Sequence, residues 1–275
     1  MFRSFCAALL FAGTVLAGSI TSAHAAGGDL LVAPTRIVLD DRRGTEVILN
    51  NVGEEVATYR ITLELRRMTP DGRLDEVSKA EANAIEQAAL KMIRYAPRRV
   101  TLPPNQPQAI RIGIRPPAEL PDGEYRAHML FRAIPDVQSV TAASNTDVEG
   151  LAIALTPIYG VTIPIIVRKG RLEATASIAN GRIERGEDGP ALAFDLARKG
   201  QGSTFGEIRV TKPGLDEPLL VARGIAVYPE LEGRTVRFPI PEELATAMTG
   251  PVSIAYYEAS NAGGGLISKI DTVLQ

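Results

Sequence analysis

The sequence predicts an all-β protein built from two sandwich domains, and three observations support this. Most segments after residue 29 alternate apolar and polar residues with a period of two, as half-buried strands do. Pro, Gly, Asn and Asp bound these segments at short intervals. A single segment, residues 78–95, has apolar residues at helical spacing. Strands that follow one another without intervening helices favour antiparallel sheets packed face to face.

The first 25 residues predict a secretory signal peptide, residues 1–25. They contain a basic Arg3, an apolar run from Phe5 to about Leu16, and the small-residue cleavage signal Ala23-His24-Ala25. The apolar run is shorter than the roughly twenty residues that a membrane span needs. We therefore expect export to the periplasm with cleavage after residue 25, and no membrane insertion afterwards.

Cleavage there would leave about 250 of the 275 residues, enough for one large domain or two ordinary ones. It would remove the chain's single cysteine, Cys6, and one of its two histidines, His24. Cysteine nucleophiles and thiolate metal sites are thereby excluded from the mature chain. The net charge would be −3, because Arg3 is the one charged residue lost from 30 basic and 32 acidic residues. This near-neutral balance gives no electrostatic case for nucleic-acid binding.

Residues 26–168 are predicted as the first domain. Seven strands in about 140 residues are typical of an immunoglobulin-like sandwich. Residues 78–95 interrupt them, and Ile85, Ala88, Ala89 and Met92 recur there at helical spacing, so a short helix or ordered insertion is expected on the sandwich. The predicted strands are LLVAPTRIVLD, TEVILNN, TYRITLELRRM, RRVTLPP, QAIRIGIRPP, EYRAHMLFRAIP and the long strand that ends at Arg168.

Residues 169–275 restart the strand pattern after a predicted hinge at Lys169-Gly170. Turns are expected at Asn180-Gly181, Asp188-Gly189-Pro190 and Glu232-Gly233. This region is predicted as a second immunoglobulin-like sandwich of about 100 residues.

The segment LAIALTPIYGVTIPIIVRKG, residues 151–170, is unusual in its length. Its odd positions from 151 to 167 are apolar or proline, while the even positions are mostly small or polar. Ordinary strands run about five or six residues, so an apolar face kept over seventeen positions needs a partner to bury it. Within one domain this would be an unusually long buried strand.

Enzyme motifs are absent from the sequence. HExxH, G-x-S-x-G, P-loop and G-x-G-x-x-G patterns do not occur. His128 has no partner that the sequence identifies and is expected to be a surface or hydrogen-bonded residue. The acid pairs Glu54-Glu55 and Glu242-Glu243 are expected to be solvated. No enzymatic activity, cofactor or metal is therefore predicted.

Arg36, within APTRIVL, is the candidate binding residue of the first strand. One interpretation is an exposed arginine on an edge strand, which discourages aggregation. The other is a guanidinium that waits for a carboxylate, since its planar fork binds one through two hydrogen bonds.

Four features in this order resemble the PapD-like family, the periplasmic chaperones of the chaperone-usher pilus pathway. Its members carry a first-strand arginine, a segment of the form SPRRVTLxPGxxQxVRV, a segment like LPxGEYRxxLxFxxIP, and then a long alternating last strand. The matches here are Arg36, Ala96 to Ile112, Leu120 to Pro135, and Leu151 to Arg168. For residues 169–275 the resemblance rests on length, strand pattern and position.

The resemblance implies two immunoglobulin-like domains in an L shape with a cleft between them. It implies a chaperone that lends its long strand to an incomplete pilus or fimbrial subunit, a form of β-augmentation, and delivers the subunit to an outer-membrane usher. Arg36 would anchor the subunit's C-terminal carboxylate. Self-association of the free chaperone is left open. Ile163 to Val167 would then pack in the core of the first domain, and Leu151 to about Tyr159 would be offered to the subunit. The donor residues would be Leu151, Ile153, Leu155, Pro157 and Tyr159.

Two departures from the family pattern bear on the site. The family pairs its first-strand arginine with a lysine on the last strand, and an ungapped count puts Pro164 there, with Arg168 or Lys169 as substitutes. The donor register also stays open, because pattern matching selects Leu151 to Leu155 whereas the ungapped count selects Leu155 to Tyr159. Since proline lacks a backbone donor, we expect this strand to lie at an edge and to be interrupted at Pro157 and Pro164.

Two other function classes are weighed against the pilus chaperone. One is a structural or accessory two-domain sandwich protein of another surface-assembly or secretion system, which the missing lysine favours. The other is a hydrolase on a sandwich scaffold, which the single mature histidine and the absent motifs disfavour.

Overall fold

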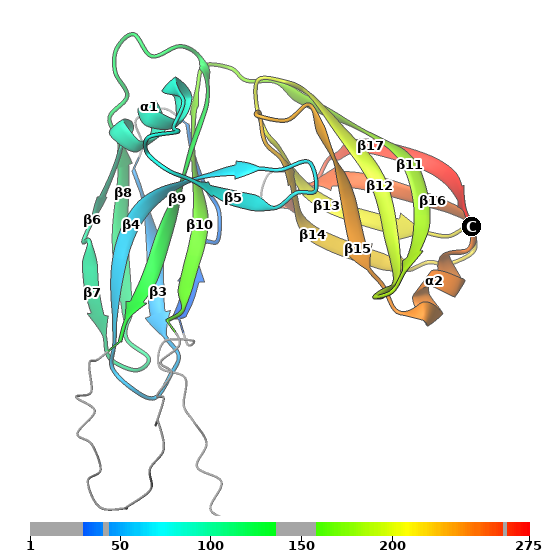
Figure 1. Ribbon diagram of the computed structural model, residues 1–275, viewed down its shortest axis with the longest axis horizontal. Helices are drawn as coiled ribbons and strands as arrows, with labels where there is room; N and C mark the ends of the chain where they lie inside the picture. The colour runs from blue at the N-terminus through cyan, green and yellow to red at the C-terminus, as the bar shows by residue number, and fades with distance from the viewer. Residues whose placement is uncertain (1–29, 41–43, 136–157, 261–262) are drawn as a thin grey trace, which may run out of the picture.

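The computed structural model describes residues 30–40, 44–135, 158–260 and 263–275. They form two elongated β-sandwich lobes set at an angle, so that the molecule is L-shaped (Figure 1). The predicted all-β fold class is confirmed. The predicted signal peptide and the predicted donors Leu151, Ile153, Leu155 and Pro157 lie outside the described residues.

The first lobe packs one sheet of order β1-β3-β8-β6 against another of order β2-β10-β9-β4-β5, in which β7 also pairs with β4. Its buried residues are alternate residues of facing strands, among them Val47, Ile61, Phe131 and Ile165. The strands are β1 Leu30–Ala33, β2 Ile37–Asp40, β3 Thr45–Asn51, β4 Ala57–Met68, β5 Leu74–Val77, β6 Ile93–Ala96, β7 Arg99–Leu102, β8 Pro107–Ile114, β9 Gly123–Ile134 and β10 Gly160–Lys169.

The opening segment, predicted as one strand, is two strands in different sheets. β1 pairs antiparallel with β3, and β2 pairs parallel with β10. Pro34 stands between them, and a residue with a fixed φ and no N–H group cannot continue the ladder of β1. Arg36 lies directly before β2 and is half-buried.

The predicted helical insertion contains a shorter helix, α1 Ala84–Met92. Asn83 caps it by accepting a hydrogen bond from the Glu86 N–H, while the Glu86 carboxylate accepts one from the Asn83 N–H. Ala89 and Met92 are buried beneath the helix, whereas Ile85 is 55% exposed and takes no part in the expected apolar face.

The second lobe packs the sheet β11-β12-β15 against the sheet β14-β13-β16-β17. Its core includes Phe194, Ile208, Ile254 and Tyr256. The elements are β11 Ala174–Gly186, β12 Gly189–Gly200, β13 Thr204–Thr211, β14 Leu220–Val227, β15 Gly233–Pro239, α2 Glu242–Met248, β16 Gly250–Glu258 and β17 Leu266–Leu274.

Two details of the second lobe differ from expectation. Asn180-Gly181 is not a turn between strands but an irregularity within β11, where the pairing with β12 shifts between Ala179 and Arg182 and Asn180 has a φ of +54°. The helix α2 was not predicted, because its seven residues are too few to show a helical period.

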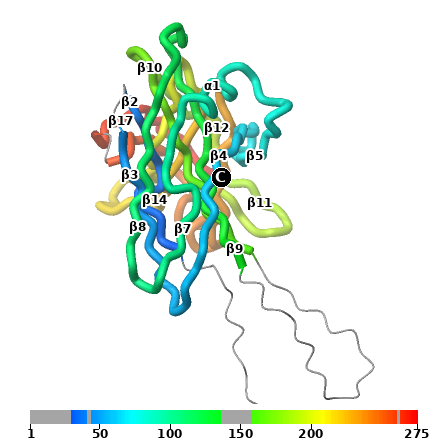
Figure 2. Tube along the Cα trace, turned by 90° about the vertical axis from the view of Figure 1, so that its left-hand side faces the viewer, coloured from blue at the N-terminus to red at the C-terminus, as the bar shows by residue number. Residues whose placement is uncertain are grey.

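The lobes meet through an apolar cluster and a hairpin. Met68, Ile166, Ala226 and Tyr228 are buried together where the first lobe's sheet contacts the second lobe. The β4–β5 hairpin reaches across to the second lobe (Figure 1), where the Thr235 N–H donates to the Pro70 carbonyl at 3.0 Å. Figure 2 views the molecule from the side of the first lobe, whose strands lie in front of those of the second.

Candidate functional site

The candidate site is on the outer face of the sheet that contains β2, β10, β9 and β4, at the contact between the lobes. Pro164 of β10 is paired with His128 of β9, which is paired with Glu64 of β4. Because β2 runs parallel to β10 from the pair Ile37 and Ile165, Arg36 is level with Pro164. Arg36, Pro164, His128 and Glu64 therefore form one row across the sheet.

The Arg36 guanidinium is held by the second lobe. Its Nη1 donates to the Tyr228 hydroxyl at 3.0 Å, and its Nη2 donates to Ser203 Oγ at 3.3 Å. Its Cζ lies 4.2 Å from the centroid of the Phe205 ring, a cation–π contact. Arg36 is thus not the exposed edge arginine of the first interpretation, and its charged group is oriented within the contact between the lobes.

A buried carboxylate links this arginine to the end of β10. The Glu124 side chain is fully buried, and its Oε2 accepts from the Ser203 N–H at 3.0 Å and from Ser203 Oγ at 2.9 Å. The Arg168 Nε donates to the same Oε2 at 3.1 Å. The structure therefore brings Arg36 and Arg168 into one chain of hydrogen bonds through Ser203 and Glu124.

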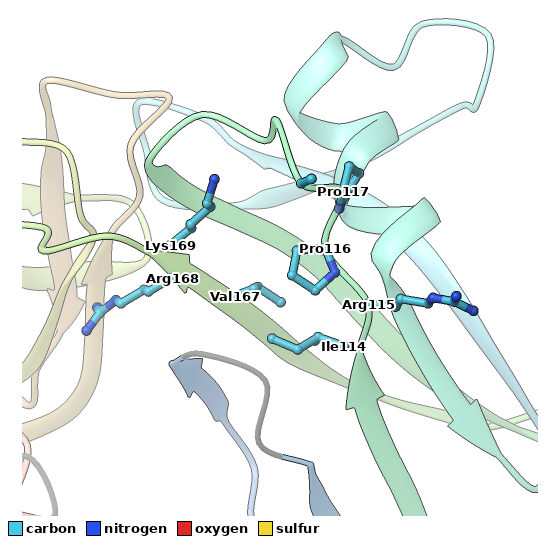
Figure 3. A pocket seen from close by; sticks show the side chains of 8 residues that line it. Ile114, Arg115, Pro116, Pro117, Val167, Arg168 and Lys169 are labelled. Carbon is cyan, nitrogen blue, oxygen red and sulfur yellow. The ribbon is translucent and has the colours of Figure 1, made fainter.

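The two suggested substitutes for the missing lysine are engaged elsewhere. Arg168 forms an ion pair with Glu124, and Lys169 Nζ donates to the Leu120 carbonyl. Lys169 and Arg168 also line a cavity of about 410 Å³ in the first lobe, together with residues that follow β8 (Figure 3). Arg36 does not line this cavity. In Figure 3 Arg115 points away from it, whereas Ile114 and Val167 point toward each other.

A second cationic contact joins the lobes beside the first. Arg126 donates to both carboxylate oxygens of Glu230, and its Cζ lies 3.5 Å from the centroid of the Tyr228 ring. Glu230 also accepts from the Met68 N–H at 2.9 Å. Tyr228 therefore lies between Arg36 and Arg126 and contacts both.

His128 was expected to be a surface or hydrogen-bonded residue, and this was wrong. It is 1% exposed, and neither ring nitrogen has a hydrogen-bond partner among the described residues. Burial lowers its pKa to about 3, and the positive charges of Arg126, Arg66 and Arg36 add to this effect. His128 is consequently neutral at physiological pH, so it cannot supply the positive charge that the family places beside the first-strand arginine.

The two edges of β10 differ along its length. Its whole length pairs with β9, but β2 covers its other edge only from Ile165 to Arg168. From Gly160 to Pro164, no strand in the described part of the chain pairs with that other edge. We call this five-residue stretch the open edge of β10.

Backbone geometry explains why Pro164 does not interrupt the strand. The Ala133 N–H donates to the Tyr159 carbonyl at 3.0 Å, so Tyr159 directs its backbone groups toward β9. Alternation in an antiparallel ladder then directs the N–H and C=O groups of Gly160 and Thr162, and the C=O of Pro164, toward the open edge. The pairing with β9 continues through Pro164 because the missing N–H falls on the other side. The expected interruption at Pro164 was thus wrong, and the expected edge position holds for Gly160 to Pro164.

Among the predicted donor residues, Tyr159 is the one that the structure describes. It is 45% exposed, and the neighbouring Ile158 is 47% exposed. Ile163, Ile165 and Val167 are buried in the first-lobe core, as expected from the alternating pattern. Val161 is half-buried and packs against the same core.

Sequence reasoning identified Arg36 but missed its partners in the second lobe. Contacts between residues 36, 203 and 228 follow from the angle between the lobes, which no local pattern encodes. One signal was available, because positions 124, 126, 128 and 132 of EYRAHMLFRAIP are charged or imidazole residues on the face opposite Tyr125, Met129 and Phe131.

Metal and membrane features are absent from the part of the chain that the structure covers. Its described residues contain no group of three or more His, Cys, Asp or Glu residues placed to hold a metal ion. None of its described helices has both the length and the apolar character to cross a membrane.

No family model and no curated protein sequence matches the chain. Solved structures that it matches include the E. coli chaperone DraB, at 14% identity and a TM-score of 0.45 over 90% of this chain and 96% of that one. The Pseudomonas aeruginosa CupB2 chaperone matches at 16% identity and a TM-score of 0.44, over 89% of this chain and 100% of that one.

A complex of Salmonella enterica SafA pilin with the SafB chaperone matches at 15% identity and a TM-score of 0.43, over 89% of this chain and 96% of that one. These structures contain chaperones, the class of protein that the sequence motifs resemble. With identities and TM-scores this low, no function is carried over from them.

Proposed function

We propose that this chain is an exported, non-enzymatic chaperone that binds a pilus or fimbrial subunit by strand pairing and delivers it to an outer-membrane usher. The observation that carries the proposal is the position of Arg36 at the end of the open edge of β10. β2 covers the next part of that edge, so Arg36 lies where an added strand would have to stop.

Strand direction supports a role for Arg36 as a carboxylate anchor. A strand of another chain that paired with the open edge in parallel with β10 would lie in line with β2. Its last residue would then come level with Ile163, next to Arg36, which is level with Pro164. A C-terminal carboxylate matches a guanidinium, because two parallel N–H groups can donate to its two oxygens.

The hydrogen-bond geometry of Arg36 fits this role. A guanidinium has five N–H donors, and the described contacts to Tyr228 and Ser203 use two of them. Both contacts come from hydroxyl groups, which orient the guanidinium without neutralising it. Arg168, in contrast, already pairs with the Glu124 carboxylate, so we assign the anchor to Arg36 alone.

The apolar donor residues would add to this anchor. Burial of four or five apolar side chains at about 1.5 to 3 kcal/mol each gives roughly 6 to 15 kcal/mol. Association costs an estimated 4 to 15 kcal/mol. The donor residues alone are thus marginal, and the ladder bonds with the carboxylate anchor would supply the remaining affinity. Donation by Leu151, Ile153, Leu155, Pro157 and Tyr159 stays a prediction.

Co-expression tests the proposal. The chain would be expressed in the periplasm with each exported protein encoded beside its gene, and soluble equimolar complexes would be isolated. We expect one such protein to become soluble only in complex, and Arg36→Ala to abolish that complex while the circular dichroism spectrum and melting temperature stay within a few degrees of wild type. Arg171→Ala, which removes an exposed charge near the hinge, is the matched control and should retain capture.

Two results would contradict the proposal. Capture at wild-type yield by Arg36→Ala would remove the anchor role. Capture of no exported protein would favour the other interpretation, a structural or accessory sandwich protein of another surface-assembly or secretion system. Encoding beside an outer-membrane usher would instead favour the chaperone.

A further inference from the structure

A row of three arginines crosses the outer face of the first lobe's sheet, away from the contact between the lobes. Arg60 of β4 is paired with Arg99 of β7 on one side and with Arg132 of β9 on the other. Residues paired in this way have their side chains on the same face, about 5 Å apart at Cβ. Arg132 is in turn paired with Gly160, the first residue of the open edge of β10. We call Arg99, Arg60 and Arg132 the arginine row.

The arginine row has no acidic partner among the residues that the structure describes. All three side chains are exposed, and none forms an ion pair or hydrogen bond with a residue in the described ranges. Like charges directly opposite one another destabilise a sheet. Two other exposed arginines of the same lobe do have acidic neighbours, since Arg73 pairs with Asp71 and Arg111 with Glu46. A row that lacks such neighbours leaves a positive surface to which an acidic group of a partner can bind.

The row ends at a residue without a side chain. A Cβ atom at Gly160 would lie 3.0 Å from Leu130 Cδ1 and 3.5 Å from the Phe131 carbonyl oxygen. Gly160 therefore places no side chain of its own between Arg132 and a strand that pairs with the open edge. An added strand would lie two strand spacings, roughly 10 Å, from β9, and the long side chain of Arg132 can meet an acidic side chain of that strand across Gly160.

We propose that the arginine row recognises an acidic side chain on the strand that pairs with the open edge. This inference rests on the proposed function and adds the register of recognition. If the partner's last residue is level with Ile163, the residue three positions before it in sequence is level with Gly160. Positions 160, 162 and 164 share one face of the sheet. The Glu or Asp therefore belongs three positions before the last residue, and the residues adjacent to it in sequence face the opposite side.

Synthetic peptides test this register. The probes are peptides of alternating apolar and polar residues with a free C-terminal carboxylate, which carry Glu, Gln or Lys three positions before the last residue. A further peptide has the Glu moved by one residue. Affinity for the full mature chain would be measured by fluorescence anisotropy at low and at high salt. We expect the Glu peptide to bind about three- to fivefold more tightly than the Gln peptide at low salt, with a smaller ratio at high salt.

Variants of the row make the test specific. Arg132→Gln should remove most of the preference for Glu, Arg60→Gln should remove less, and Arg99→Gln the least, because the distance to the open edge increases in that order. Lys199→Gln removes an exposed charge from the second lobe and should keep the full preference. The peptide with the displaced Glu should bind like the Gln peptide.

The possible results separate the two proposals. If the peptides bind in an Arg36-dependent way but without preference for Glu, the arginine-row inference is overturned and the proposed function stands. A preference that Arg132→Gln does not reduce also overturns the inference. If no peptide binds, strand addition at the open edge fails, and the inference fails with it.

Discussion

The two halves of β10 differ in what lies beside them. From Ile165 to Arg168 the strand lies between β9 and β2, whereas from Gly160 to Pro164 it has β9 alone among the described strands. The change occurs at a proline, and Arg36 lies level with it. This comparison teaches that Pro164 marks the limit of the covered half. Pro164 has no backbone N–H to donate toward β2, and it lies directly before Ile165, where the pairing with β2 begins.

The largest expected effect comes from placing an additional proline in the covered half of β10. Ile166→Pro should lower the free energy of unfolding by about 3 kcal/mol or more, because it removes a ladder donor toward β2 and the buried Ile166 side chain. Thr162→Pro should cost about 1 kcal/mol, since its N–H points to the open edge and the 3.3 Å bond from Thr162 to Glu64 is lost. Urea unfolding of both variants measures the difference.

Thr162→Pro, the less destabilising of the two variants, should be the more damaging to subunit capture. Thr162→Pro folds but lacks a donor that an added strand needs, so subunit capture should be lost. Equal destabilisation by the two substitutions would show that the backbone of β10 does not alternate as inferred.

A second test concerns His128, which is paired with Pro164 at the limit between the halves. Its pKa is about 3 in the folded chain and near 6.5 when unfolded. Below pH 6.5 the unfolded chain binds a proton that the folded chain does not, so stability falls as pH falls toward 3. About 2 to 3 kcal/mol should be lost between pH 7 and pH 4.5 on this account.

The charges around His128 act in a consistent direction. Arg126, Arg66 and Arg36 oppose its protonation, and Glu64 is paired with Arg66. In His128→Leu the imidazole's part of the pH dependence should vanish, whatever the variant's stability at pH 7. Unfolding free energies at several pH values for both proteins provide the measurement. Parallel curves for the two proteins would contradict a neutral buried imidazole.

The smallest expected effect sharpens the role of the second lobe in orienting Arg36. Tyr228→Phe removes the hydroxyl that accepts from Arg36 Nη1 and keeps the ring beneath Arg126. It should cost about 1 kcal/mol of stability and weaken subunit capture several-fold rather than abolish it. Tyr257→Phe, on the half-exposed side chain of β16, is the control. Capture equal to wild type in Tyr228→Phe would mean that Arg36 needs no orientation by the second lobe.

Much of the fold follows from local pattern. The period of two placed the strands, and the burial of Ile163, Ile165 and Val167 follows from it directly. The division of the opening segment into β1 and β2 does not follow from this period, because strand periodicity does not reveal which sheet a residue joins. The helix α2 was missed because seven residues span barely two helical turns.

The candidate site was less predictable than the fold. Arg36 stood out because it is a charge among β-branched residues. Its partners Tyr228 and Ser203 are about 170 to 190 residues away, so only the packing of two folded lobes brings them together. The arginine row escaped notice for a similar reason, since Arg60, Arg99 and Arg132 become neighbours only through strand register.

The β4–β5 hairpin gives the two lobes a second connection. The chain links them covalently beyond Lys169, and the hairpin links them again through Pro70 and Thr235, with Met68 and Glu230 beside it. Two bodies joined at one point can twist and bend freely, whereas a second attachment removes the torsional freedom and leaves opening about the line between the attachments. The β4–β5 hairpin therefore restrains the angle at which Arg36 meets the second lobe.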